Sequence, residues 1–184
     1  MFKRLFGRER GNRAVVSTLY EEIVAAARQP VFYRDWGVPD TPLGRFEMLG
    51  VHAFLVLDRL KDESGPAREL AQELTDHFFG DVESSLREIG IGDMGIPKRM
   101  KKLARMFYGR VTSYSDALAR GDRLALAQAL ARNVRPDNAS VDAAAEALAD
   151  YVRDLRAGLR GQPLENLMQG RIVLRPLESR EAAA

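Results

Sequence analysis

The sequence MGIPKRMKKLARMFYGRV spans residues 94–111 and carries the periodicity on which our fold prediction depends. Its apolar residues, followed to position 118, recur at intervals of 4, 3, 4, 4, 3 and 4. Such intervals place side chains along one side of an α-helix. The stripe consists of Ile96, Met100, Leu103, Phe107, Val111, Tyr114 and Leu118. The spacing therefore predicts a helix with one apolar face turned toward a core.

The same segment concentrates positive charge, with six basic residues and no acidic residue between positions 98 and 110. At about 100° per residue, Lys98, Lys101, Lys102 and Arg105 project almost opposite the apolar stripe. Cations near a helix N-terminus interact unfavourably with the helix dipole. Their presence there is explained better by binding to an anionic partner than by simple exposure to solvent. We predict a partner-binding basic face that consists of Lys98, Arg99, Lys101, Lys102, Arg105 and Arg110.

The composition is that of a globular protein with unevenly distributed charge. The 184 residues are 46% hydrophobic and 29% charged, and the lack of cysteine excludes disulfides and thiolate chemistry. The net charge is +2, but outside residues 1–13 and 98–110 there are 17 basic and 25 acidic side chains. Clustered cations indicate an anionic partner such as RNA, a membrane surface or an acidic protein patch. With no apolar run long enough to cross a bilayer, we expect a cytoplasmic protein, with peripheral attachment to the inner membrane as an option.

Residues 1–13 form a basic N-terminal segment with five basic side chains and one acidic side chain. Two interpretations stay open. The segment is either a disordered, solvated terminus or a short interfacial anchor. In the second case Phe2, Lys3, Arg4 and Phe6 would make a weak membrane contact, insufficient to hold the chain on a bilayer alone.

Caps, prolines and glycines divide the remaining chain into helices. We expect helices near residues 14–29, 42–61, 66–89, 96–119, 123–133, 140–160 and 163–168. Residues 31–40 are expected to form an aromatic loop whose Trp36 packs on the core, and residues 172–174 to be extended. The predicted fold is all-α, a single compact helical domain of about six to seven helices over residues 14–170. A loose C-terminal tail would cover residues 171–184.

Three constellations resemble reactive sites, but each has a simpler interpretation. Residues 90–95 match G-x-G-x-x-G, yet a helix precedes them, so we expect a glycine hinge and no nucleotide site. The Glu69, Glu73 and His77 series is expected to be a solvated acidic edge, and His52 a hydrogen-bonded core residue. The chain has no recognisable catalytic set. We therefore predict no catalytic residue, metal, cofactor or small-molecule substrate, and hence no enzyme.

Five segments resemble the ubiquinol–cytochrome c chaperone family. They are residues 32–41, 44–47, 51–60, 93–101 and 107–110, and the likeness covers roughly residues 31–135. The lysine-rich segment that ends in Phe107-Tyr108-Gly109-Arg110 is the most specific of them. The lack of a long organellar presequence makes the chain similar to a compact bacterial form.

The resemblance implies a non-enzymatic chaperone that binds newly made cytochrome b and supports assembly of ubiquinol–cytochrome c reductase, respiratory complex III. It also implies contact with the ribosome near the tunnel exit and a small partner subunit. On this basis Phe107, Tyr108 and Gly109 would shape the client or partner surface beside the basic face. Gly109, with Thr112 and Ser113, would admit a partner closely, although a local kink also explains a mid-helix glycine. General RNA or ribosome binding, or membrane-peripheral scaffolding, is the alternative function.

Overall fold

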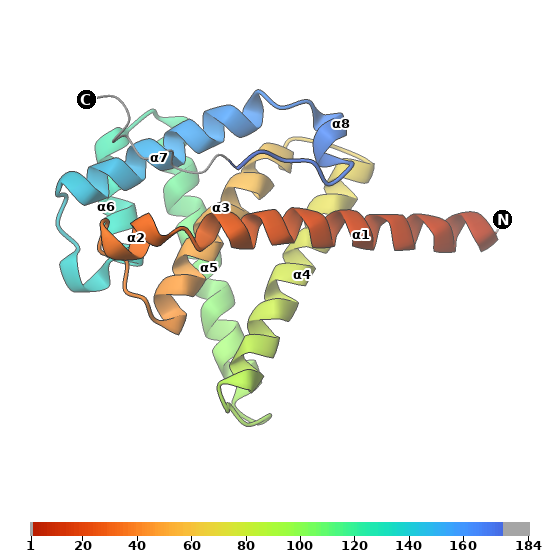
Figure 1. Cartoon of the computed structure of the whole chain (residues 1–184), viewed down its shortest axis with the longest axis horizontal. Coiled ribbons are helices and arrows are strands. Elements are labelled where there is room, and N and C mark those ends of the chain that lie inside the picture. Colours follow the sequence, from red (N-terminus) through yellow and green to blue (C-terminus); the bar gives the residue numbers. More distant parts are fainter. Residues whose placement is uncertain (1, 175–184) are drawn as a thin grey trace.

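The computed structural model describes residues 2–174, with side chains described from Asn12 onward. Within these residues the fold is all-α, and it combines six helices of 12 to 26 residues with two short ones and one 3-10 turn (Figure 1). The order is α1 (Phe2–Ala27), α2 (Pro30–Arg34), α3 (Pro42–Leu60), α4 (Pro66–Glu88), α5 (Ile96–Ala119), α6 (Arg123–Val134), η1 (Pro136–Asn138), α7 (Ala143–Arg160) and α8 (Leu164–Leu167). The prediction of a single helical domain is confirmed.

Helix α3 is the centre of the molecule. Thr41 caps it by accepting a hydrogen bond from the Gly44 backbone N–H at 3.1 Å, and Pro42 occupies its first turn. Its middle is buried on nearly every side, and it packs against α1, α4, α5, α6 and α7 (Figure 1). The apolar sequence of α3 on all its sides follows from this position.

His52 lies at the centre of α3 and is fully buried. Its Nδ1 is 2.8 Å from the Met48 carbonyl, which can only accept, so Nδ1 carries the proton. Its Nε2 then accepts from the Tyr151 hydroxyl of α7 at 2.7 Å. Burial lowers the pKa of His52 to about 4, so the ring is neutral at physiological pH. The prediction of a hydrogen-bonded core histidine is confirmed.

Three local predictions differ from the structure. Helix α1 begins at Phe2, so residues 2–13 continue the helix expected from position 14. Residues 31–40 are not all loop, because Pro30 starts α2 and turns the fully buried Phe32 toward Trp36, 5.5 Å away between ring centroids. The tail begins later than expected, since Ile172 and Leu174 are buried in the core. Residues 175–184 lie outside the described part of the chain.

Helices α4 and α5 form an antiparallel hairpin that extends from the body of the molecule (Figure 1). Helix α4 ends at Glu88, and the following turn places Gly90 at φ 86°, a conformation that favours glycine. Arg87 pairs with Glu83 at 2.7 Å and also with Asp93, which ties the turn to α4. The G-x-G-x-x-G segment thus links two helices, and no strand precedes it within the described residues.

Candidate functional site

The first half of α5 carries five exposed cations. They are Lys98, Arg99, Lys101, Lys102 and Arg105. Within residues 12–174 none of the five forms an ion pair, and the first turn of α5 contains no acidic residue. The structure therefore places these five predicted residues together on an open surface of the hairpin.

Arg110 departs from the predicted basic face. Its guanidinium forms a two-pronged ion pair with the carboxylate of Glu47 on α3. The Glu47 side chain is 3% exposed and that of Arg110 is 18% exposed, so the pair is largely removed from water. Burial raises the pKa of Glu47 to about 7, and Arg110 opposes this rise. Arg110 thus fastens α5 to the central helix and is not free to bind a partner.

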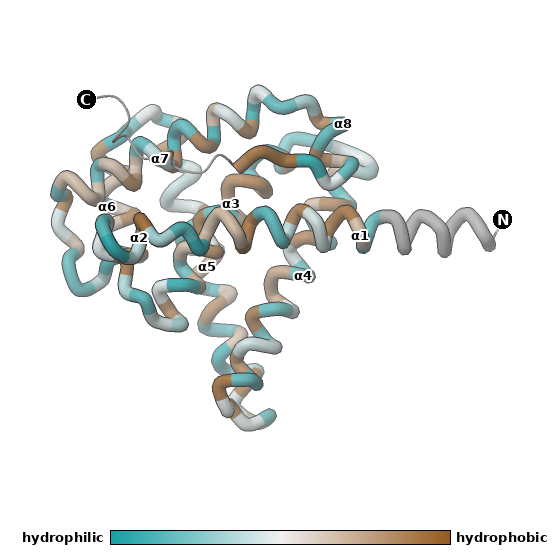
Figure 2. The backbone as a smooth tube through the Cα atoms, in the orientation of Figure 1, coloured by the Kyte–Doolittle hydropathy of each residue, from teal (hydrophilic) through white to brown (hydrophobic). Residues whose placement is uncertain are grey.

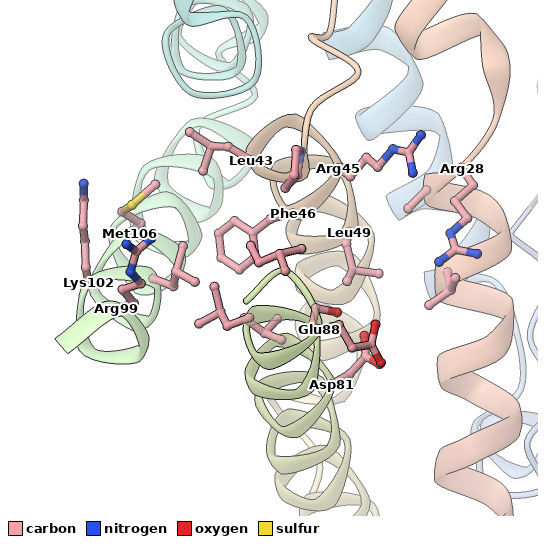
Figure 3. Close-up of a pocket in the computed structure, with 18 of the residues that line it drawn as sticks. Arg28, Leu43, Arg45, Phe46, Leu49, Asp81, Glu88, Arg99, Lys102 and Met106 are labelled. Carbon is pink, nitrogen blue, oxygen red and sulfur yellow. The ribbon is translucent and has the colours of Figure 1, made fainter. Parts of the chain in front are cut away.

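A groove of about 510 Å³ lies beside the basic face, between α1, α3, α4 and α5. Its apolar lining includes Val24, Leu43, Phe46, Leu49, Val82, Leu86, Ile89, Leu103 and Met106. Figure 3 shows Arg99 and Lys102 on one side of this lining and Arg28 and Arg45 on the other. Asp81 and Glu88 also line the groove.

The rim cations of the groove differ in their availability. Arg45 pairs with Asp40 at 2.6 Å. Arg28, Arg99 and Lys102 have no ion-pair partner within the described residues. An apolar floor with unpaired cations on both sides suits a hydrophobic segment that also carries negative charge. The prediction from sequence did not include this groove, because its residues come from four helices that only the fold brings together.

The predicted client surface of Phe107, Tyr108 and Gly109 divides between core and surface. Phe107 is 2% exposed and packs on Phe78, 5.0 Å away between ring centroids, in keeping with its place on the predicted apolar stripe, so it can shape this surface only from the core side. Tyr108 is 55% exposed and lines a second depression of about 300 Å³ between α3, α4 and α5. A side chain at Gly109 would meet no atom within 4 Å. Nothing within the described residues therefore requires glycine there.

The hydroxyls beside Gly109 are already engaged with the helix backbone. Thr112 donates to the Tyr108 carbonyl and Ser113 to the Gly109 carbonyl, both at 3.1 Å. The predicted small-residue patch thus exists as an open surface, but its two hydroxyls serve α5 itself.

The remaining candidate residues contribute no reactive cluster. Glu73 accepts a hydrogen bond from Asn12 at 2.7 Å, and His77 packs edge-on against Tyr20. Among the described residues no group of His, Asp and Glu side chains is arranged to hold a metal ion. The side chains of Phe2, Lys3, Arg4 and Phe6 lie outside those described. No described helix has the length and apolarity needed to span a bilayer.

The sequence of this chain is similar to that of a known protein family. The model of the ubiquinol–cytochrome c chaperone family matches residues 34–174. The frog (Xenopus laevis) ubiquinol–cytochrome-c reductase complex assembly factor 1 is 27% identical over 82% of this chain and 76% of its own length. The fly (Drosophila melanogaster) factor of the same name is 24% identical, and the alignment covers 86% of this chain but 61% of the fly protein.

A solved structure supports the same assignment. The Cbp3 homolog from Brucella abortus is 52% identical and superposes with a TM-score of 0.84, over 95% of this chain and 98% of that one. The family match covers the central helix, the hairpin and the part of the groove lining that comes from α3, α4 and α5. The chain therefore belongs to the ubiquinol–cytochrome c chaperone family.

Proposed function

We propose that this protein is a non-enzymatic chaperone for the assembly of ubiquinol–cytochrome c reductase, with newly made cytochrome b as its client. The observation that carries the proposal is the apolar groove with unpaired cations on its rim, in a chain that belongs to the chaperone family. The named relatives are assembly factors of this reductase complex, which supports the choice of process.

The chemistry of the groove suits a segment of a membrane protein before it is inserted or assembled. Such a segment has apolar side chains that would be covered by Phe46, Leu49 and Leu86. A carboxylate or chain terminus on the same segment would pair with Arg28 or Lys102 (Figure 3). Holding a client in this way needs shape and charge but no catalytic group, which fits a non-enzymatic role.

Binding to the ribosome is a second candidate function, favoured by the five unpaired cations of α5. Contacts of this kind to RNA phosphates are independent of sequence and weaken steeply with salt. In that case α5 would hold the chaperone near the site of cytochrome b synthesis, with or without a small partner subunit. We place the protein in the cytoplasm or peripherally on the inner membrane.

A photo-crosslinking experiment tests the client proposal. A photo-reactive phenylalanine analogue replaces Met106, which lines the groove, and as a control replaces Leu124, which is 57% exposed on α6. We expect cytochrome b among the crosslinked products of the Met106 variant only. Equal crosslinking from both positions would reject the groove as the client site, and ribosomal proteins alone would favour the second function.

A charge-reversal variant tests the basic face separately. Lys98, Lys101 and Arg105, none of which lines the groove, are changed to Glu, and Arg120 and Arg132, which are exposed elsewhere, are changed to Glu as a control. We expect the first variant to fold but to lose reductase assembly in cells, and the control to retain it. Wild-type assembly in the first variant would show that the basic face is not required.

A further inference from the structure

The tip of the α4–α5 hairpin exposes apolar side chains that the fold does not use. Met94 is 99% exposed and Ile89 is 58% exposed, and both lie in or beside the turn between the two helices. Figure 2 shows hydrophobic residues reaching this end of the hairpin, which Figure 1 shows extended away from the body. Nearly all of the Met94 side chain and more than half of Ile89 stay exposed after folding, so this apolar surface is available for a partner.

A cluster of basic side chains on α5 follows the apolar tip. Lys98, Arg99, Lys101 and Lys102 all fall within the first seven residues of α5, and hence within roughly 10 Å of the turn along the helix axis. Near the turn, Asp93 is paired with Arg87, and Glu88 is the other carboxylate nearest to it in the sequence. The order from the tip inward is therefore apolar side chains first and cations second.

This order matches the structure of a lipid bilayer surface. At about 100° per residue the five cations spread over roughly 160° of the circumference of α5. A spread of that width suits a plane of phosphate groups better than the single carboxylate of a protein partner. An added side chain at Gly90 or Gly92 in the turn would meet no atom within 4 Å, so these positions do not enclose a partner's side chain.

We propose that the hairpin tip docks on an anionic lipid bilayer, with Met94 and Ile89 in the headgroup region and the basic face of α5 on lipid phosphates. The proposal goes beyond the proposed chaperone function and does not rest on it. Ile89 also lines the groove, so docking would place the groove opening beside the membrane. A groove in that place would lie where a membrane-protein client enters or leaves the bilayer.

Vesicle flotation of the full chain tests the docking. Vesicles of phosphatidylcholine alone are compared with vesicles that contain about 30 mol% phosphatidylglycerol. We expect binding only to the anionic vesicles, and a loss of binding as salt is raised. Met94→Ser should weaken it about tenfold, because its apolar contact is lost. Lys98→Gln with Lys101→Gln should weaken it about twenty-five-fold, or roughly fivefold for each charge.

Matched controls separate the tip from the rest of the surface. Leu124→Ser with Val173→Ser removes similar exposed apolar area elsewhere, and Arg120→Gln with Arg132→Gln removes similar charge. Both controls should bind like wild type. Leu43→Asp alters the groove but not the tip. With the photo-reactive group at Met106 it should therefore lose client crosslinking, and it should keep vesicle binding. A failure of client binding is therefore distinguishable from a failure of docking.

A single engineered thiol reports the depth of the tip. Because the chain contains no cysteine, Met94→Cys can be labelled with a polarity-sensitive dye, with Leu124→Cys as the control. On anionic vesicles the dye at Met94 should shift to the blue and be quenched by brominated lipids, and the dye at Leu124 should not. Binding with no change at Met94, equal changes at both positions, or a response to ribosomal RNA but not to vesicles would overturn the proposal.

Discussion

Arg105 and Arg110 lie on the same helix, carry the same charge and have opposite environments. Arg105 is exposed and has no ion pair within the described residues. Arg110 is paired with the buried carboxylate of Glu47. Five residues correspond to about 140° of rotation around an α-helix, which takes Arg110 from the open face to the edge of the apolar stripe. The comparison shows that helical phase, more than local charge density, decides whether a cation serves the fold or a partner.

The two environments imply different energetic roles. A cation at the exposed start of α5 gains little from the fold and opposes the helix dipole. Arg110 compensates a carboxylate that burial would otherwise make costly. We therefore expect substitutions in the first group to affect binding and substitutions at Arg110 to affect stability.

Arg110→Ala should give the largest change in stability. It leaves Glu47 buried without its partner, which we expect to lower the free energy of unfolding by about 3 kcal/mol. Arg105→Ala removes the same side chain from the exposed face and should change stability by less than about 0.5 kcal/mol. Urea denaturation of the two variants measures the difference. Equal effects would contradict the distinction between the paired and the free arginine.

The double variant Glu47→Leu with Arg110→Met is the companion test. It replaces the buried pair with apolar side chains of similar size, so it should recover most of the stability lost in Arg110→Ala. If the double variant is as unstable as the single one, packing around Arg110, and not the uncompensated carboxylate, accounts for the loss.

The pH dependence of stability should report the buried carboxylate. The pKa of Glu47 is raised to about 7 from an ordinary value of 4.5, so between these values the folded state binds more protons than the unfolded state. The stability due to Glu47 is therefore fully present below about pH 4.5 and is lost as pH rises through 7. Relative to Glu47→Gln, wild type should lose roughly 3 kcal/mol between pH 4.5 and 8.

The reference variant removes the contribution of other titrating groups. His52 is present in both proteins, so its own loss of stability toward low pH cancels in the difference. The measurement is a set of urea titrations of both proteins between pH 4.5 and 8. A difference that stays constant with pH, or that changes in the opposite direction, would show that Arg110 outweighs burial at Glu47.

Helix caps and glycine stops in the sequence predicted where several helices begin and end. Thr41 caps α3, Asp122 caps α6 by accepting from the Ala125 N–H at 2.9 Å, and Gly121 ends the preceding turn at φ 65°. Each of these features acts over a few residues, so the sequence shows it directly. The burial of His52 was predictable for the same reason, since apolar residues surround it along α3.

Contacts between distant segments account for what sequence reasoning missed. Glu47 and Arg110 are 63 residues apart in the sequence. The residues around each of them give no indication that the two side chains form an ion pair. The groove requires α1, α3, α4 and α5 in their final positions. One indication was available, however, because at about 100° per residue Arg110 lies about 60° from the middle of the apolar stripe, nearer than any of the five exposed cations. Helical phase alone could have separated it from the basic face.

Gly109→Ala extends the comparison to the open side of α5. The new methyl group has free space around it, and alanine is about 1 kcal/mol more favourable than glycine within a helix. We therefore expect higher stability by thermal unfolding. If a partner approaches α5 closely at Gly109, the same variant should support less reductase assembly. Gly80→Ala on α4, where the added methyl group also meets no atom, is the matched control.

Lys98→Glu should have a small effect on stability, with the opposite sign from Arg110→Ala. Lys98 is in the first turn of α5, where a carboxylate interacts favourably with the helix dipole, so the variant should be more stable by about 0.5 kcal/mol. It should also bind anionic vesicles or RNA less well. A gain in stability with a loss of binding would show that this cation is retained at the expense of the fold. A loss of stability would instead mean that Lys98 has a structural partner, and the division of α5 into a binding half and a structural half would fail.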